Sequence, residues 1–257
     1  MAMHADVRNK LLVSLPPDEL RGILPLCEEV PVEVGERIIG ADETIRYAFF
    51  PESGLLSVSF DAGGRGCLDM SVVGQEGMVS TASVLGVGRT PHEVRARVGG
   101  TALRIAVGSL RELILRNAVL RLTLMRYVQA TIVSGHQTAL GLHRCKLEQR
   151  LAAWVLQAAD RLPGDDIEIT HEVLAQVLGT HRPGITAALQ KLVRGKAIAA
   201  GRRKLTVLDR ARLATIAGAG YGTAEREYAR LIAPLSPGRP SSEPVASSRT
   251  ADCAEEL

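Results

Sequence analysis

Aromatic side chains are scarce in this 257-residue chain, at 3% of all residues. Its cores must therefore be aliphatic, and binding that depends on bases stacked on Phe or Tyr side chains is disfavoured. The four cysteines stand far apart and form no CxxC pair, at Cys27, Cys67, Cys145 and Cys253. This spacing excludes a zinc ribbon and a run of iron–sulfur ligands, and it suggests no disulfide framework. Scattered thiols fit a reducing compartment.

Long apolar runs are also missing. No segment reaches the roughly 18 apolar residues of a membrane span, and the opening MAMHADVRNK lacks the apolar region of a signal peptide. From these absences we expect a soluble, cytoplasmic protein with no membrane partner. The formal net charge is only +3, which excludes a bulk polycation. Any surface that binds anions must therefore come from local clustering of charge.

Length and pattern predict two folded parts, since domains of roughly 100–200 residues are usual. Residues 6–26 contain short helical turns punctuated by prolines. Residues from about 30 to 107 hold short β-rich runs separated by turns, namely VPVEVGERIIG, YAFFPESGLLSVSF, GCLDMSVVG and EVRARVGGTALRIA. This spacing predicts an antiparallel roll, sandwich or barrel. The last residues, 233–257, are rich in Pro and Ser without periodicity, and we expect them to be disordered.

A helical pattern follows from Ser109 to about Leu142. Ser109 and Glu112 have the spacing of a capping box. Apolar and small residues then recur at alternating spacings of three and four, at Met125, Val128, Ile132, Gly135, Ala139 and Leu142. This is the period of a coiled coil. One interpretation is a stripe that packs on its own domain. The other is a dimer helix, favoured because the small Gly135 and Ala139 would let two backbones approach.

The stretch THEVLAQVLGTHRPGITAALQKLV, residues 170–193, predicts two short helices joined by a tight turn, after an amphipathic helix at 143–162. Thr170 is suited to cap the first helix and Gly179 to end it in a left-handed conformation. The second helix is expected to begin near Arg182-Pro183 and to turn Ile185, Leu189 and Leu192 inward. A helix pair with a polar outer face on its second member is a helix-turn-helix, whose second helix enters the ~12 Å major groove.

The residues that follow predict a wing. AIAA-GRRK-LTVLD contains two short strands joined by a basic turn, and after Asp209 a last helix is expected to about Leu231. Residues 170–208 contain seven Lys or Arg against one acid, Glu172, a local charge of +6. Such cations suit phosphate contacts, which supply affinity without sequence information. The alternative is a helical hairpin that only packs and has a solvated basic face. The wing and the concentration of charge favour DNA binding.

On these strings the chain resembles the superfamily of the cyclic-AMP receptor protein and the fumarate–nitrate regulator, Crp/Fnr, over about residues 10–215. VGERII, YAFFPESGLLSV, GQEGMV and VRARVGGTALRI resemble the effector roll, EQRLAAWVL the segment after the dimer helix, and THEVLAQVLGTHRPGITAALQKL the helix-turn-helix. The resemblance implies an α+β fold. It divides the chain into a cyclic-nucleotide-binding-like antiparallel β-roll with an N-terminal helical segment (1–108), a long dimerisation helix region (109–145), a winged helix-turn-helix domain (146–232) and the tail (233–257).

The same resemblance implies partners. A member of this family is a homodimer that reads a palindromic operator on double-stranded DNA, and contact with RNA polymerase is expected with it. The dimer helix carries signals from the effector pocket to the DNA-binding heads.

The effector pocket departs from the family pattern. The family's ribose-binding glutamate falls on Met78 and its phosphate-binding Arg-Ser pair on Thr90-Pro91, and these side chains supply neither a strong acceptor nor a positive charge. Arg89 would substitute only after a loop shift, so cyclic AMP is not expected and the effector is unknown. The pocket candidates are Gly77, Met78, Arg89, Thr90 and His92. The cysteine spacing excludes an iron–sulfur sensor, haem bound by His92 or His136 stays open, and no cofactor or metal is assigned.

The second helix of the pair departs too. Arg182 falls on the family's groove-facing arginine, which can bind guanine O6 and N7. The family's following glutamate is Pro183 here and its second arginine is Ala187, so the operator should differ. We expect base contacts from His181, Arg182, Thr186 and Gln190. We expect phosphate contacts from Thr170, Lys191, Arg202, Arg203 and Lys204.

The leading hypothesis is a sequence-specific transcription regulator that answers an unidentified effector or is constitutively active. A second is a ligand- or partner-binding module whose helix-turn-helix no longer reads DNA. An enzyme is the weakest class. The sequence shows no Ser-His-Asp or Cys-His arrangement, no P-loop and no cluster with metal-ligand spacing, and the glycines of DAGGRG lack the strand-to-helix context of a phosphate loop.

Overall fold

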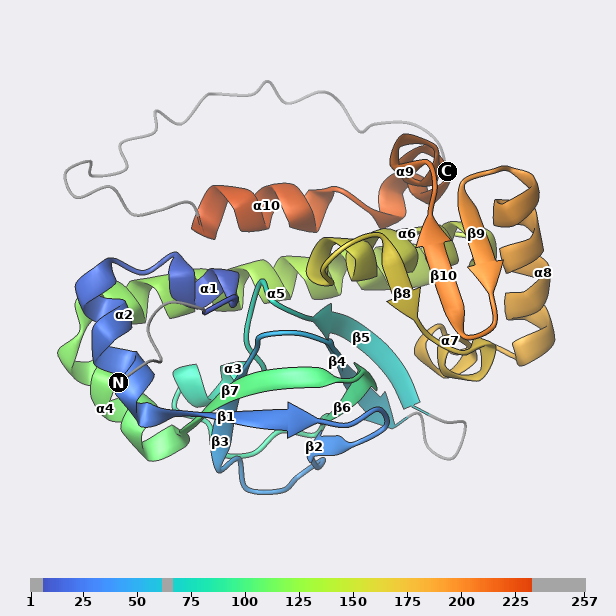
Figure 1. The fold of residues 1–257 in the computed structure, drawn as a ribbon. Coiled ribbons are helices and arrows are strands. Elements are labelled where there is room, and N and C mark those ends of the chain that lie inside the picture. Colours follow the sequence, from blue (N-terminus) through green and yellow to red (C-terminus); the bar gives the residue numbers. More distant parts are fainter. Residues whose placement is uncertain (1–6, 62–66, 233–257) are drawn as a thin grey trace, which may run out of the picture.

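The computed structural model describes residues 7–61 and 67–232, and the tail expected to be disordered lies outside these ranges. The described chain is α+β: a β-roll comes first, a long helix follows it, and a winged helix-turn-helix lies at the far end of that helix (Figure 1). This is the predicted fold class.

The roll consists of two antiparallel sheets, and the spacing of short β-rich runs had predicted an antiparallel roll, sandwich or barrel. One sheet has the strand order β1-β7-β3 and the other β2-β6-β4-β5. Their bounds are β1 Cys27–Val32, β2 Arg37–Ile39, β3 Tyr47–Pro51, β4 Leu55–Asp61, β5 Cys67–Val73, β6 Glu93–Val98 and β7 Gly100–Ala106. Short helical elements precede and interrupt these strands: α1 Lys10–Val13, α2 Pro17–Ile23, η1 Leu24–Leu26 and α3 Thr81–Val84.

The long helical region is two helices rather than one. The first, α4, spans Val107–Arg116 and the second, α5, spans Ala118–Arg144. Asn117 interrupts them with an extended backbone, and its side chain accepts from the Leu120 amide at 2.9 Å, so it caps α5. Apolar side chains of the roll and of both helices share one core, for example Phe50, Leu110 and Leu124.

The predicted capping box at Ser109 is wrong. The first helix begins at Val107, two residues earlier, and its N-cap Ala106 has no side-chain cap. The physical reason is the sheet: β7 pairs with β3 as far as Ala106, and the Val107 amide donates to the Arg46 carbonyl. The chain therefore passes from strand to helix without a linker. Within the described ranges, no helix combines the length and hydropathy needed to cross a membrane, not even the 27-residue α5.

The winged helix follows the predicted order, with α6 starting four residues later than expected because α5 extends to Arg144. Its sheet has the order β8-β10-β9 and is antiparallel. Its elements are α6 Leu147–Arg161, β8 Asp166–Glu168, α7 His171–Val177, α8 Arg182–Arg194, β9 Ile198–Gly201, β10 Lys204–Val207 and α9 Arg210–Ala217.

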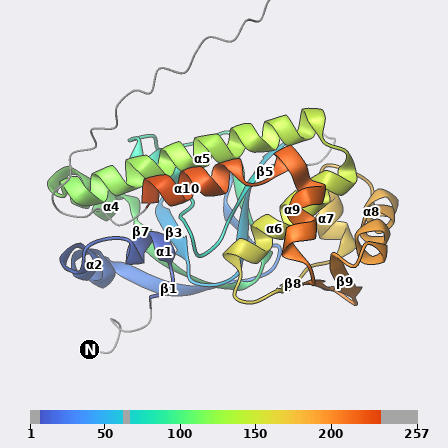
Figure 2. The same cartoon turned by 90° about the horizontal axis from the view of Figure 1, so that it is seen from above.

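The single last helix expected to Leu231 is instead broken. After α9 come η2 (Gly218–Gly220) and α10 (Thr223–Ile232), because Gly218 and Gly222 have φ values of 53° and 104°, which end a helix. The α10 helix turns back and lies along α5 (Figures 1 and 2). Buried Gln137 of α5 accepts from the Thr223 and Ala224 amides at 2.9 and 3.0 Å, so α5 caps α10.

The roll and the winged helix share a packed junction. Leu55 of β4 and Val72 of β5 belong to the same buried cluster as the helices of the winged domain, such as Trp154 of α6 and Leu178 next to α7. The roll therefore supplies part of the core on which α7 and α8 rest.

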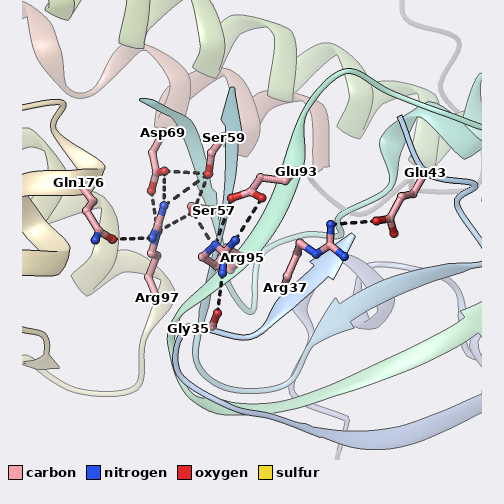
Figure 3. Close-up of polar contacts among 10 residues, drawn as sticks. All are labelled: Gly35, Arg37, Glu43, Ser57, Ser59, Asp69, Glu93, Arg95, Arg97 and Gln176. Atoms are coloured by element: carbon pink, nitrogen blue, oxygen red, sulfur yellow. Dashed lines mark hydrogen bonds and ion pairs between the residues drawn. The ribbon is translucent and has the colours of Figure 1, made fainter. Parts of the chain in front are cut away.

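A buried ion pair lies at this junction (Figure 3). The side chains of Arg97 on β6 and Asp69 on β5 are 4% and 3% exposed, and the guanidinium meets the carboxylate through hydrogen bonds of 2.6 and 3.0 Å. Arg97 also donates to the Ser57 hydroxyl at 2.8 Å, and Ser59 donates to Asp69 at 2.9 Å. The remaining guanidinium nitrogen of Arg97, Nη1, donates to Oε1 of Gln176 on α7 at 3.5 Å. The pair thus touches the helix-turn-helix directly.

Removing one partner of this pair should be costly, because the other charge stays buried without compensation. We expect Asp69→Asn to lower the free energy of unfolding by about 3–5 kcal/mol, measured by urea denaturation followed by circular dichroism. Glu43→Gln is the matched control: its pair with Arg37 is 55% and 51% exposed (Figure 3) and should change stability by less than about 1 kcal/mol. Equal effects of the two changes would contradict the assignment.

Candidate nucleic-acid interface

The first helix of the pair is capped at both ends as the sequence predicted. The Thr170 hydroxyl accepts from the Val173 amide at 3.2 Å, which satisfies one free donor of the first turn of α7. Gly179 has φ 57° and its amide donates to the Gln176 carbonyl, while the Thr180 amide closes onto the Ala175 carbonyl at 2.9 Å. This left-handed turn sets the direction in which the next helix starts.

The second helix, α8, buries one face and exposes the other. Ile185, Leu189 and Leu192 are buried, as predicted, in the cluster shared with α6 and α7. Pro183 lies in its first turn, where a missing amide is tolerated. Because α8 lies at one end of the molecule (Figure 1), its outer face points away from the roll.

Most residues expected to contact bases lie on this outer face. His181, Arg182 and Gln190 are exposed. Thr186 is half-buried, and its hydroxyl donates to the Arg182 carbonyl at 3.1 Å and lies 3.1 Å from Nδ1 of His171. His171 is not among the residues predicted from the sequence to contact DNA. Its place beside Thr186 follows from the crossing of α7 and α8, for which the sequence carries no local signal.

The wing brings most of the expected phosphate contacts together. The turn between β9 and β10 consists of Arg202 and Arg203, and Arg203 has φ 59°. Its carbonyl accepts from the Ile169 amide at 3.0 Å, which holds the wing tip next to Thr170. Thr170, Arg202, Arg203 and Lys204 line one hollow of about 660 Å³ that faces the roll. Lys191 lies apart from them on α8 and does not line this hollow.

Some basic side chains of the interface are already paired with carboxylates, and others are free to contact phosphate. Lys191 pairs with Glu148 at 3.1 Å and Lys204 with Asp166 at 2.7 Å. Hydrogen bonds from Lys204 and Thr206 lower the pKa of Asp166, so its carboxylate is charged at neutral pH. Within residues 170–208, all of which the structure describes, five exposed cations make no ion pair: Arg182, Arg194, Lys196, Arg202 and Arg203. These five carry uncompensated positive charge toward solvent.

The effector candidates lie in different surroundings. Met78 is buried in the core under α5, and a Cβ at Gly77 would lie 1.9 Å from the Tyr127 hydroxyl. Arg89 is exposed and lines a cavity of about 560 Å³ beside β2 and β3. Buried Thr90 donates to the His92 carbonyl at 3.4 Å, and the His92 ring packs against Phe60. Burial lowers the pKa of His92, so its imidazole is neutral at pH 7.

The expected dimer stripe is split by the fold. Met125 and Ile132 are 51% and 46% exposed, and Ala139 is exposed beside them. Val128 is buried within the chain, whereas Gly135 and Leu142 are partly buried. The open face of α5 is extended by Leu122 and Leu140.

Comparison with known proteins agrees with this geometry. Residues 149–216 match the family model of the Crp-like helix-turn-helix domain. No curated protein matches the chain. The solved structure of FixK2 from Bradyrhizobium japonicum is similar, with 16% identity and a TM-score of 0.64, over 75% of this chain and 98% of that one.

Two further solved structures are similar at this level. A CRP-family transcriptional regulator from Thermus thermophilus is 18% identical with a TM-score of 0.60, over 74% of this chain and 96% of that one. CLP from Xanthomonas campestris, described as a c-di-GMP responsive global regulator, is 13% identical with a TM-score of 0.59, over 75% of this chain and 99% of that one. Residues 149–216 therefore form a Crp-like helix-turn-helix domain, and the chain has the fold of the Crp/Fnr transcription regulators.

Proposed function

We propose that the protein is a homodimeric, sequence-specific DNA-binding regulator of transcription. The observation that carries the proposal is the outer face of α8, where Arg182 is exposed and unpaired on a helix whose inner face is fully buried. A helix held in this way presents its N-terminal side chains to base edges in the major groove. The unpaired Arg202 and Arg203 of the wing supply phosphate contacts beside it.

We assign the dimer interface, the contact with a second copy of this chain, to the open face of α5. Four large apolar side chains are 44–51% exposed there, at Leu122, Met125, Ile132 and Leu140. Their spacing of three, seven and eight residues places them on one side of a helix, and an apolar stripe of this kind marks an interface. Pairing of α5 with its copy would relate the two recognition helices by a two-fold axis, so the operator would be palindromic.

Each part of the chain is assigned its own role in this proposal. Residues 1–108 form the sensing part, 109–145 the dimer region and 146–232 the DNA-binding part. Cyclic AMP is not proposed as the effector, because Met78 is buried in an apolar core and Thr90 is committed to the local turn.

Selection of bound fragments from a random duplex pool, without added ligand at about 0.15 M salt, tests the proposal. A palindromic site with half-sites about one helical turn apart is expected. Binding with no dependence on salt, or no binding to duplex DNA at all, would favour a partner-binding module that no longer reads DNA.

Replacement of Arg182 should relax specificity. We expect Arg182→Ala to cost about 1–3 kcal/mol at one base position of each half-site, measured by competition between operator variants. Arg116→Ala, exposed at the end of α4, is the control and should leave the site preference unchanged. A uniform loss of affinity over all operators would contradict a base contact.

Replacement of Arg203 should make DNA binding less dependent on salt concentration. We expect Arg203→Gln to reduce the slope of log K against log salt by about 0.9 for each phosphate that the side chain no longer neutralises. Lys204→Gln is the matched comparison and should change the slope less, because Lys204 already pairs with Asp166. Equal slopes for the wild type and Arg203→Gln would contradict a phosphate contact from the wing.

A charged side chain in the middle of the exposed apolar stripe of α5 should dissociate the dimer. Ile132→Asp is expected to give monomers that bind the operator at least tenfold more weakly, measured by light scattering and fluorescence anisotropy. Leu85→Asp, at a position that is 59% exposed next to α3, should remain dimeric. An Ile132→Asp variant that stays dimeric would show that the interface lies elsewhere.

A further inference from the structure

The polar side chains that α8 offers to DNA are few. Arg182, Thr186 and Gln190 follow one another at spacings of four residues, which places them on one face of the helix. The exposed Pro183 and Ala187 carry no hydrogen-bonding side chain. An arginine can only donate, whereas the amide of Gln190 both donates and accepts. What Thr186 reads depends on how its own proton and lone pairs are used.

The hydroxyl of Thr186 has two polar neighbours within the protein. Its Oγ1 donates to the carbonyl of Arg182, one turn earlier on α8, at 3.1 Å. The same oxygen lies 3.1 Å from Nδ1 of His171, the first residue of α7. The two helices pack against each other at the end of the molecule (Figure 1). Buried side chains of both belong to one core, so the fold holds the three groups together.

These two neighbours decide where the proton of Thr186 points. A hydroxyl has one proton and two lone pairs. When the proton points to the Arg182 carbonyl, an Nδ1–H imidazole or an imidazolium at His171 donates to Oγ1, and both contacts are satisfied. When His171 has the other tautomer, Nδ1 competes for the same proton. A proton that pointed away from both would leave two acceptor oxygens facing each other at 3.1 Å, which is repulsive. In each tautomer the third position around Oγ1 is a lone pair.

This third position is the one left for DNA. The bond between Thr186 and the Arg182 carbonyl lies on the exposed side of α8, and Thr186 itself is only half-buried. A base edge that approaches here meets an acceptor. In the major groove the donors are the exocyclic amino groups, N6 of adenine and N4 of cytosine, whereas guanine O6 and thymine O4 are acceptors. The hydroxyl of Thr186 therefore matches an amino group.

We propose that Thr186 is a specificity-determining residue, which accepts from the amino group of an adenine or a cytosine at one position of each half-site. His171 is the positioning residue that holds its hydroxyl. The inference rests on the proposed DNA-binding function and deepens it. A threonine is in general able to contact either kind of base edge, and here its two protein neighbours remove that choice. Arg182, which only donates, and Thr186, which only accepts, would read opposite patterns one helical turn apart.

Removal of the amino group from the DNA tests the proposal on the unchanged, full-length protein. The position read by Thr186 is the one at which Thr186→Val relaxes the base preference of the selected operator. There the base is replaced by its analogue without the amino group, purine for adenine or pyrimidinone for cytosine. We expect wild-type affinity to fall about fivefold, the effect of one hydrogen bond, measured by fluorescence anisotropy. Thr186→Val keeps the shape without the acceptor and should bind both duplexes within about twofold.

Thr215→Val is the matched control. Thr215 is exposed on α9 and donates to the Ala211 carbonyl at 3.0 Å in the same way. Its replacement should leave the base preference unchanged at every position.

Two variants test the role of His171. We expect His171→Leu to reduce discrimination at the Thr186 position about threefold, because the hydroxyl loses one of the two groups that orient it. In His171→Asn the amide nitrogen can take the place of Nδ1 and should restore discrimination to within about twofold. Thermal unfolding followed by circular dichroism checks that each variant is folded. Unchanged discrimination in His171→Leu would overturn the positioning role.

The acceptor role of Thr186 is overturned by any of three results. These are guanine or thymine as the preferred base at its position, an equal loss of affinity for wild type and Thr186→Val when the amino group is removed, and no position at which Thr186→Val alters the preference. The first two need no assumption about the stability of His171 variants. A wild-type protein that binds no duplex DNA would contradict the proposed function itself, and this inference with it.

Discussion

The position of the helix-turn-helix depends on the buried contact between the roll and the winged domain. Arg97 and Asp69 are both removed from solvent at this junction, and Arg97 reaches Gln176 on α7 (Figure 3). A buried charge pair tolerates little displacement, because its desolvation is offset only when the geometry is good. Leu55 and Val72 add roll side chains to the core beneath α7 and α8. Orientation of the recognition helix is thus tied to the strands β4, β5 and β6.

The electrostatics of the interface depend on pairing more than on the number of cations. The chain has a formal net charge of only +3, and two of the basic residues of the interface, Lys191 and Lys204, already have carboxylate partners. Exposed pairs of this kind contribute little to stability, yet they reduce the charge available to a phosphate. What remains is Arg182 at the start of α8, Arg202 and Arg203 at the wing tip, and Arg194 and Lys196 at and just after the end of α8. Arginine suits this role because its planar fork can meet a guanine edge or a phosphate with two hydrogen bonds.

The α5 helix has two faces with different partners. One face holds Tyr127 and Gln137, which anchor the neighbouring turn and the start of α10. The other face exposes the apolar stripe to which the second copy is assigned. The same helix therefore packs against β5 and α10 on one side and carries the assigned interface on the other.

The sequence by itself determined the classes of element and their order. Short β-rich runs separated by turns predicted the strands of the roll. Thr170, Gly179 and Pro183 marked the ends of α7 and the start of α8 correctly, because caps and turns are local chemistry. Tertiary structure alone decided the rest. The start of α4 was set by pairing of β7 with β3, the break at Gly218 let α10 fold back onto α5, and the stripe was divided when Val128 turned inward. The ion pair of Arg97 and Asp69 and the contact between His171 and Thr186 join residues 28 and 15 positions apart, respectively. Their formation depends on how layers pack, which no local pattern encodes.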